Sequence, residues 1–369
     1  MSPLRLKIFA LASLASLAAI PLAQWWGDQA AGQPWTGRRL FERLPTAAHL
    51  RAVEQEQQSA AARNPYLRLL GEAPGLQWLR AADSPVMQAR GAGSPSESAW
   101  LFYRPDVRLV SQRPSPDAAE RAAAATIHWR DQLATRGIRL IVVVAPTKAL
   151  VHPPASLAVE AVWKSPELQT YQAALQAGQV EYVDLHAAFA GAPPEVRRKA
   201  PLYLPTDTHW SRHGLDLASA TIAGRISGPR RTDAYVVREL AVPHVGDLER
   251  WRAPAIPPGP QTVAQITDAQ GKAVSPRPGE AEVLLIGDSF CRIFEEGSVV
   301  GAGLRSQLAW RLGRPVAMVQ RDGGGATLVR QELARRPEWL RGVKVVVWEF
   351  AERDLTSPDA EWSPVELPR

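Results

Sequence analysis

The chain of 369 residues is long enough to bury a complete hydrophobic core, as one large domain or as two of ordinary size. Its 43 basic and 37 acidic residues give a formal net charge of +6, but the basic residues are spread along the chain and no nucleic-acid-binding motif accompanies them. The composition therefore argues against a nucleic-acid partner, and the single cysteine, Cys291, excludes a framework of intramolecular disulfides. Thirteen tryptophans add modest weight to a carbohydrate partner, because indole rings stack on sugar rings.

The first 26 residues have the pattern of an export signal. Arg5 and Lys7 form a short positive region, and an uncharged apolar run follows from Ile8 to Ile20 and extends to Trp26 with few polar breaks. This predicts a signal peptide or an uncleaved signal-anchor helix over residues 1–26, with its cationic end in the cytoplasm. The remaining chain is then expected in the periplasm, anchored to the inner membrane. A buried N-terminal helix is the alternative.

Residues 27–97 are rich in Ala, Arg, Gln and Pro and are expected to form a tether with one or two helices. Residues 98–369 are expected to form the folded body, because helical patterns there alternate with β-branched runs. The alternation predicts βαβ units in a doubly wound, mostly parallel sheet with three layers. The expected elements are helix 117–137, strand "IRLIVVVAPTK", helix 166–177, strand "VEYVDL", a helix after Trp210, strand "AEVLLIGDS", helix 304–312, strand "PVAMVQ", helix 327–335 and strand "VKVVVWEF".

The alternation stops between residues 230 and 279, where the chain is rich in Pro and Gly. This stretch is expected to be an insertion on the active face of the sheet, with short antiparallel strands. It is also expected to form one wall of an open groove.

Ser289 follows the apolar strand "VLLIG", where an open parallel sheet binds its ligands. Two roles are open to this serine: a nucleophile, or the N-cap of the next helix. All seven histidines precede Ser289, so the α/β-hydrolase order of Ser, acid and His is excluded and any general base must come from upstream. Cys291 competes as a nucleophile, because tuned thiolates are reactive.

The best candidate for the base lies in "YLPTDTHWSRHG", residues 203–214. Asp207 and His209 are two residues apart, so in an extended loop their side chains lie on one side, where the carboxylate can orient the imidazole. His186, which follows a strand beside Asp184, is a weaker candidate. His244 is weaker too, because it lies in the irregular insertion.

His209 and His213 also allow a zinc site, since histidines four apart on a helix can share a metal. No Glu lies between them as in the HExxH motif, and His209 is expected to precede the helix. We therefore expect no metal and no cofactor.

The order of the two motifs carries a resemblance to a known family. "TDTHWSRHG" followed by "LLIGDSF" resembles the SGNH-hydrolase-like domain of the AlgJ/AlgX type, which is found in bacterial exopolysaccharide O-acetyltransferases. That family has D-x-H-W, a following Gly and a later G-[DT]-S, whereas ordinary SGNH esterases place the serine motif first. The likeness spans about residues 98–356 and includes "VVVAPTKALV" and "VVVWEFAERDL".

The resemblance implies Ser289 as the nucleophile, His209 as the general base and Asp207 as its orienting acid. The oxyanion hole would use the Ser289 backbone N–H and a second donor, and the Gly-rich turn "QRDGGGAT" lies at another strand end. Further oxyanion or substrate contacts expected at the site are Lys148, Trp210, Arg292, Arg321 and Gly324.

The function implied is O-acetyl transfer to hydroxyls of an exported polysaccharide, alginate-like or other, through a serine acyl-enzyme. In systems of this type a multipass membrane O-acyltransferase supplies the acetyl group, so a partner of that kind is expected. Two alternatives stay open: a periplasmic carbohydrate acetylesterase with the same triad, and a non-catalytic polysaccharide-binding component of an export complex.

Overall fold

The computed structural model describes residues 86–89, 100–111, 116–152, 164–226, 228, 235–251, 259–297, 299–356 and 361–368. The chain divides into two compact units, Met1–Asp83 and Ser84–Arg369, and all the described residues belong to the second. The predicted membrane helix over residues 1–26 and most of the predicted tether lie outside the described residues. Within the described part of the chain, no helix is both long and apolar enough to cross a membrane.

A five-stranded sheet forms the centre of the described unit, and each pair of neighbouring strands in it is parallel. The predicted α/β fold with a mostly parallel sheet is thus confirmed. The strands are β-branched runs that are covered on both faces, as a parallel sheet requires. In spatial order they are β4 (Glu181–Val183), β3 (Arg139–Ala145), β9 (Val345–Ala351), β7 (Val283–Gly287) and β8 (Val316–Gln320).

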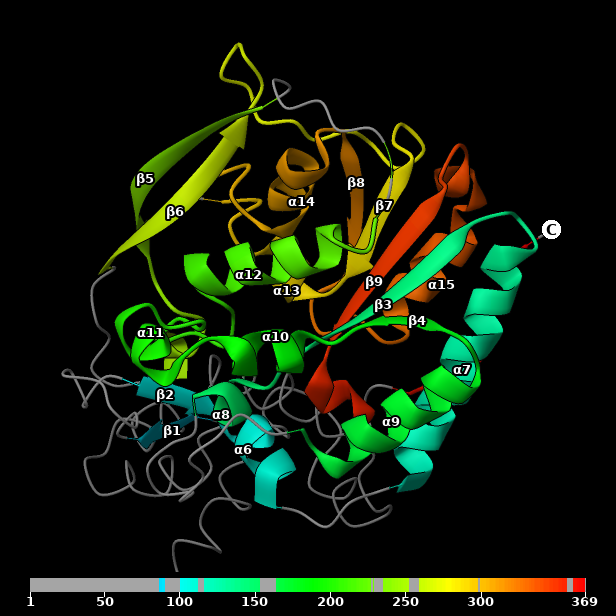
Figure 1. The fold of residues 1–369 in the computed structure, drawn as a ribbon, viewed down its shortest axis with the longest axis horizontal. Helices are drawn as coiled ribbons and strands as arrows, with labels where there is room; N and C mark the ends of the chain where they lie inside the picture. The colour runs from blue at the N-terminus through cyan, green and yellow to red at the C-terminus, as the bar shows by residue number, and fades with distance from the viewer. Residues whose placement is uncertain are drawn as a thin grey trace, which may run out of the picture. The chain divides into compact units, whose positions relative to one another are not determined.

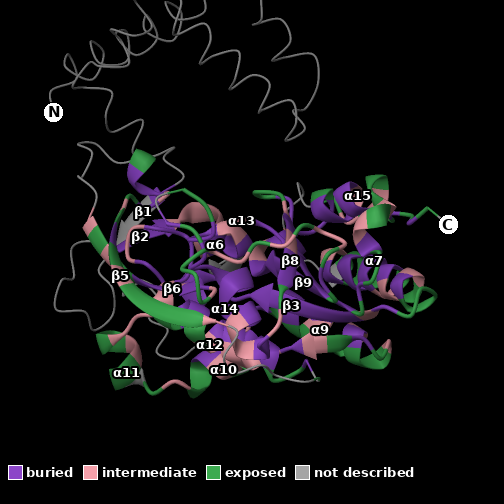
Figure 2. Cartoon of the chain, turned by 90° about the horizontal axis from the view of Figure 1, so that it is seen from above, coloured by how far each residue is buried: buried purple, intermediate pink, exposed green. Residues whose placement is uncertain are grey.

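Helices cover both faces of this sheet, which makes three layers (Figure 1). Leu285 of β7 packs into the core on one face and Leu284 into the core on the other, because successive side chains of a strand point to opposite sides. Figure 2 shows the buried residues concentrated in the sheet and on the helix sides that face it. One face carries α10 (Leu185–Gly191), α12 (Arg212–Ala223) and α14 (Leu304–Leu312); the other carries α7 (Pro116–Ala134), α9 (Pro166–Ala177) and α15 (Leu328–Arg335).

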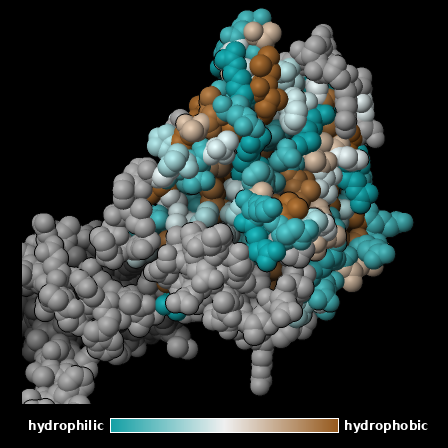
Figure 3. All heavy atoms as spheres, turned by 60° about the vertical axis from the view of Figure 1, so that its left-hand side comes forward, coloured by the Kyte–Doolittle hydropathy of each residue, from teal (hydrophilic) through white to brown (hydrophobic). Residues whose placement is uncertain are grey.

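The predicted insertion contains an antiparallel hairpin of β5 (Val236–His244) and β6 (Gly259–Thr267). The hairpin rests on the α14 side of the sheet, where the Gln307 side chain donates a hydrogen bond to the Ala264 carbonyl over 3.1 Å. Much of β5 faces solvent. From this side of the molecule, apolar side chains are interspersed with polar ones (Figure 3).

Several short elements lie outside the three layers. β1 (Val86–Ala89), which falls inside the range predicted as tether, pairs with β2 (Trp100–Tyr103) in a second antiparallel sheet. The backbone N–H of Leu101 in β2 donates to the Pro205 carbonyl over 2.8 Å, so this small sheet touches the segment that holds the DTH motif. The remaining elements are α6 (Arg104–Ser111), α8 (Lys148–Val151), α11 (Pro194–Lys199), α13 (Ser289–Arg292) and the 3-10 turns η3 (Glu249–Trp251), η4 (Pro337–Leu340) and η5 (Glu352–Leu355).

Candidate active site

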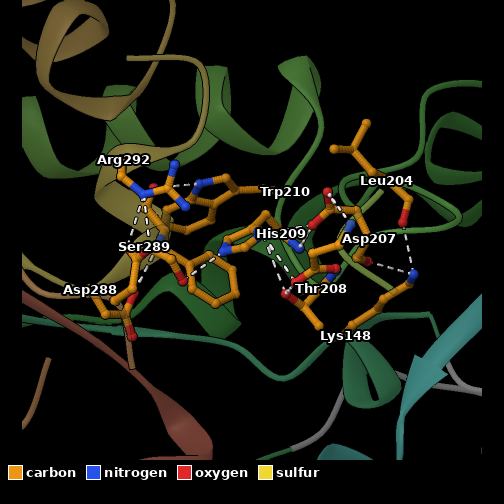
Figure 4. A network of polar contacts seen from close by, with 12 residues as sticks. Lys148, Leu204, Asp207, Thr208, His209, Trp210, Asp288, Ser289 and Arg292 are labelled. Atoms are coloured by element: carbon orange, nitrogen blue, oxygen red, sulfur yellow. Dashed lines mark hydrogen bonds and ion pairs between the residues drawn. The ribbon is translucent and has the colours of Figure 1, made fainter. Parts of the chain in front are cut away.

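Ser289 is the first residue of α13, immediately beyond the carboxyl end of β7. The N-cap of this helix is Asp288, whose Oδ1 accepts the Phe290 N–H over 2.8 Å and whose Oδ2 accepts the Ala351 N–H over 3.3 Å. Asp288 therefore does the work of a cap residue, and the hydroxyl of Ser289 is free to point into the site. Figure 4 shows it directed toward His209.

His209 lies in a narrow loop that precedes α12. The loop is closed by backbone hydrogen bonds from Leu204 N–H to the His209 carbonyl (3.0 Å) and from Ser211 N–H to the Leu202 carbonyl (2.9 Å). His209 Nε2 lies 2.7 Å from Ser289 Oγ, and its ring packs against an aromatic ring of α13 at 4.8 Å. The loop therefore presents the imidazole within hydrogen-bond reach of the hydroxyl.

Asp207 holds the other side of this imidazole. Its Oδ1 accepts hydrogen bonds from His209 Nδ1 over 2.6 Å and from the His209 backbone N–H over 3.0 Å. Because Nδ1 carries the proton given to the carboxylate, Nε2 is left as an acceptor for the serine hydroxyl. The structure thus brings Asp207, His209 and Ser289 into one hydrogen-bonded series (Figure 4).

The pKa of Asp207 is lowered and the pKa of His209 is raised. Burial alone would raise the pKa of Asp207, but the two imidazoles that bind it outweigh burial and hold the pKa well below its usual range. Burial alone would lower the pKa of His209, but the attraction of Asp207 outweighs it and raises that pKa. Asp207 therefore stays ionised and makes His209 a stronger base.

Two further residues bind the His209 loop: His244, the last residue of β5, which the sequence ranked low, and Asp247 in the turn that follows. Asp207 Oδ2 accepts hydrogen bonds from His244 Nε2 over 2.8 Å and from the Asp247 backbone N–H over 3.1 Å. The Asp247 carboxylate binds Thr208, through its backbone N–H at 2.8 Å and its hydroxyl at 2.5 Å. The close spacing of His244 and Asp247 is the only sequence signal for them, and each binds the loop of His209 rather than the other.

Lys148 binds the backbone of the loop that carries Asp207 and does not face the site. Its Nζ, on a side chain that is 2% exposed, lies 2.7–2.8 Å from the backbone carbonyls of Leu101, Leu204, Pro205 and Asp207. Burial lowers the pKa of Lys148 to about 7, although nearby acidic side chains oppose the shift. The residue expected to contact substrate is therefore enclosed by backbone oxygens, three of them in the loop that carries Asp207.

Trp210 was expected to contact substrate, but the structure buries it completely. Its Nε1 donates to the Phe290 carbonyl over 3.1 Å, and the two rings pack edge to face at 4.9 Å. Trp210 therefore holds α13 against the His209 loop and offers no surface to a substrate.

The two arginines expected at the site are engaged with acids. Arg292 donates through Nε to Asp322 over 2.9 Å, and its side chain is 37% exposed. Arg321 pairs with Glu332 of α15 over 2.8 Å. Arg292 belongs to the same short helix as Ser289, whereas the structure directs the Arg321 guanidinium toward α15.

The Gly-rich turn approaches Asp288 through Gly325. The backbone N–H of Gly324 is used within the turn, where it donates to the Arg321 carbonyl over 2.9 Å. A Cβ on Gly325 would lie 3.1 Å from Asp288 Cβ and 2.9 Å from Phe350 Cβ, so a side chain at this position would push the turn away. The next glycine along, and not Gly324, therefore sets how closely this turn packs on the Ser289 helix.

The competing nucleophile, Cys291, and the competing base, His186, each bind a glutamate. Cys291 is fully buried, its Sγ donates to Glu349 over 3.2 Å, and burial with the nearby acids raises its pKa well above the usual value. The thiol is therefore kept protonated. His186 Nε2 lies 2.9 Å from Glu352 Oε2, and this carboxylate also accepts the Thr147 N–H, so His186 belongs to a buried pair away from Ser289.

Among the described residues, Asp207, His209 and Asp247 form a group whose potential metal-ligating atoms lie within 4.8 Å of one another. His213, the partner of His209 in a zinc site, is not in this group. The Asp207 and His209 atoms already bind each other directly, and the Asp247 carboxylate binds Thr208. Hydrogen bonds inside the protein therefore account for the cluster.

Residues 94–352 match the family described as "SGNH hydrolase-like domain, acetyltransferase AlgX". The chain belongs to this family. The match includes Asp207, His209 and Ser289, together with the hairpin of the insertion.

Curated and structural relatives agree with the AlgX family. The probable alginate O-acetylase AlgJ of Azotobacter vinelandii is 25% identical over 264 residues, and the match covers 63% of this chain and 64% of that relative's length. The O-acetyltransferase domain of Pseudomonas putida AlgJ has a similar fold, with a TM-score of 0.54 and 22% identity over 73% of this chain and 91% of that domain. Pseudomonas aeruginosa AlgX has a TM-score of 0.51 and 18% identity over 72% of this chain and 61% of its own.

Asp207 and Asp247 both approach His209, and exchange of each acid for its amide distinguishes them. In Asp207→Asn, one oxygen that binds an imidazole is replaced by an NH2 group, so kcat for acetyl-ester cleavage should fall by roughly two to four orders of magnitude. Asp247→Asn keeps the backbone N–H that binds Asp207, so we expect a loss of about tenfold or less. Steady-state kinetics of both variants measure the difference. A larger loss in Asp247→Asn would assign the acid to Asp247.

Removal of the Lys148 ammonium should lower the free energy of unfolding, because this group holds the loop that carries Asp207. Lys148→Met removes the cation that the carbonyls of Leu101, Leu204, Pro205 and Asp207 share, so urea denaturation of the full chain should show a loss of about 3 kcal/mol or more. Lys164→Met is the matched control, because Lys164 pairs with Asp184 at a partly exposed position and should lose about 1 kcal/mol or less. Equal stability of Lys148→Met and the parent chain would contradict this support role.

Proposed function

We propose that this chain is an O-acetyltransferase that moves acetyl groups to hydroxyls of an exported polysaccharide through an acetyl ester on Ser289. The hydrogen-bonded series of Asp207, His209 and Ser289 in a chain of the AlgX family supports this proposal. The name of the Azotobacter vinelandii relative, "probable alginate O-acetylase", supports a glycan as acceptor. The proposed product of this chain is therefore a polysaccharide that carries acetyl esters.

The first half-reaction forms the acetyl-enzyme. His209 Nε2 takes the proton of the Ser289 hydroxyl while Oγ forms a bond to the carbonyl carbon of the acetyl donor. Asp207 stabilises the imidazolium that results. The donor's oxygen then leaves with the proton from His209, and the acetyl group stays on Ser289.

The second half-reaction uses the same groups in reverse. A sugar hydroxyl gives its proton to His209 and attacks the acetyl carbon, and Ser289 Oγ leaves with that proton. The backbone N–H of Ser289 is the first proposed donor to the oxyanion in both steps, with a second donor from the Gly-rich turn. Arg292, in the same helix and partly exposed, is the proposed contact for an anionic or hydroxyl-rich acceptor.

The proposed setting is the periplasmic face of the inner membrane, with residues 1–26 as signal or anchor. A multipass membrane O-acyltransferase is the proposed source of acetyl groups. A tethered catalytic body of this kind acetylates the polymer during its export, before the polymer leaves the cell.

An acetyl-transfer assay tests the proposal. The full chain is mixed with a chromogenic acetyl ester and with oligosaccharides of the host's exopolymer, and acetylated sugar and free acetate are measured together by mass spectrometry. We expect acetylated sugar to form faster than free acetate. Ser289→Ala should abolish both products, because it removes the acetyl-accepting oxygen.

Cys291→Ser is the matched control for that variant. A hydroxyl at this position can still donate to Glu349, so most of the activity should remain. Activity in Ser289→Ala would end the nucleophile assignment. Release of acetate at an unchanged rate with no acetylated sugar would instead identify an esterase.

A further inference from the structure

We propose that His244 is a positioning residue, which fixes the Asp207 carboxylate in the orientation that His209 needs. The inference rests on the proposed use of Ser289 and His209, and it assigns the insertion hairpin a part in the active site. His244 is the last residue of β5, so the hairpin itself carries this imidazole to the site.

The hydrogen bonds of Asp207 define what His244 does. The carboxylate is buried, and its two oxygens are divided between two segments of the chain. Oδ1 accepts from His209 Nδ1 and its backbone N–H, whereas Oδ2 accepts from His244 Nε2 at 2.8 Å and from the Asp247 N–H at 3.1 Å. A carboxylate only accepts, so His244 Nε2 carries the proton in this contact.

Loss of the His244 donor would leave Oδ2 with a single backbone hydrogen bond. With one bond fewer on Oδ2, the carboxylate can rotate more freely about its Cβ–Cγ bond, and rotation moves Oδ1 away from His209 Nδ1. The imidazole would then lose both its orientation and the nearby negative charge that stabilises its protonated form. His244 therefore acts on Ser289 only through Asp207 and His209.

The structure holds His244 through its backbone and through its ring. Its backbone pairs with Gly259 at the end of the β5–β6 ladder. Its ring lies 5.3 Å from the ring of Phe294, which follows α13 and has a positive φ of 59°, a conformation that a bulky residue seldom adopts. The hairpin and the segment after the Ser289 helix therefore meet at His244.

Close backbone contact fixes the same turn against the His209 loop. A Cβ on Gly246 would lie 2.0 Å from the Thr206 carbonyl oxygen, so only glycine allows this approach. Asp247 adds the hydrogen bonds to Thr208 on the far side of Asp207. Residues 244–247 thus contact the loop on both sides of the Asp207 carboxylate. A turn that only faced solvent would not need these contacts.

The test separates the hydrogen bond from the bulk of the side chain. His244→Leu removes the donor, and His244→Gln keeps an N–H at the position of Nε2. His213→Leu is the matched control, because His213 is an exposed imidazole near His209 in sequence with no part in the network. The rate of the first turnover with a chromogenic acetyl ester and the KM for that ester are measured for each variant, with thermal unfolding as the folding check.

We expect His244→Leu to slow acetylation of Ser289 by roughly 10- to 100-fold with little change in KM, as expected for the loss of a hydrogen bond to a buried charged group. His244→Gln should stay within about threefold of the parent chain, and His213→Leu should match it. If His244→Leu does not fold, His244→Asn takes its place, because its shorter amide does not reach Oδ2.

An unchanged acetylation rate in His244→Leu, or an equal loss of rate in His244→Leu and His244→Gln, would overturn the positioning role. Ser289→Ala, measured in parallel, keeps the two proposals distinct. An inactive Ser289→Ala beside a fully active His244→Leu contradicts only the role of His244, whereas an active Ser289→Ala contradicts the proposed function itself.

Discussion

The buried Asp207 carboxylate is the constraint on which the rest of the site depends. A buried charge is tolerated only when it is paired and hydrogen-bonded, and here four donors from two segments share its two oxygens. The need to satisfy both oxygens fixes the loop of His209 relative to the turn after β5. Because the first of these segments also meets α13, the position of Ser289 relative to its base follows from the same contacts.

The parallel sheet supplies the other half of the arrangement, because the carboxyl ends of its strands lie at one edge. Ser289 follows β7, Lys148 follows β3 and Glu352 follows β9. Only Ser289 turns its side chain toward His209; Lys148 binds the carbonyls of the loop, and Glu352 binds backbone N–H groups and His186. The reactive serine thus lies beside strand ends that are themselves anchored, which suits a site that must hold its geometry through two half-reactions.

Local pattern was enough to predict the layers and the pair Asp207/His209. The β-branched runs became the strands of the sheet, α14 has the bounds predicted for it, and the two-residue spacing placed Asp207 beside His209. His244 was ranked too low, because its role depends on a hairpin whose strands pair across an irregular segment. Lys148 was misjudged for the same reason: a lysine after a strand faces a ligand or backbone carbonyls according to segments far away in sequence, here β2 and the loop before α12.

The central claim is that Ser289 carries the acetyl group between donor and acceptor. The most direct measurement is mass spectrometry of the full chain after a rapid acid quench of its reaction with an acetyl donor, without acceptor, followed by peptide mapping. The account predicts one acetyl group per chain, on the peptide that contains Ser289, which disappears when acceptor oligosaccharide is added before the quench. An acetyl group that maps to another residue, or turnover of donor with no acetylated chain at any time, would contradict it.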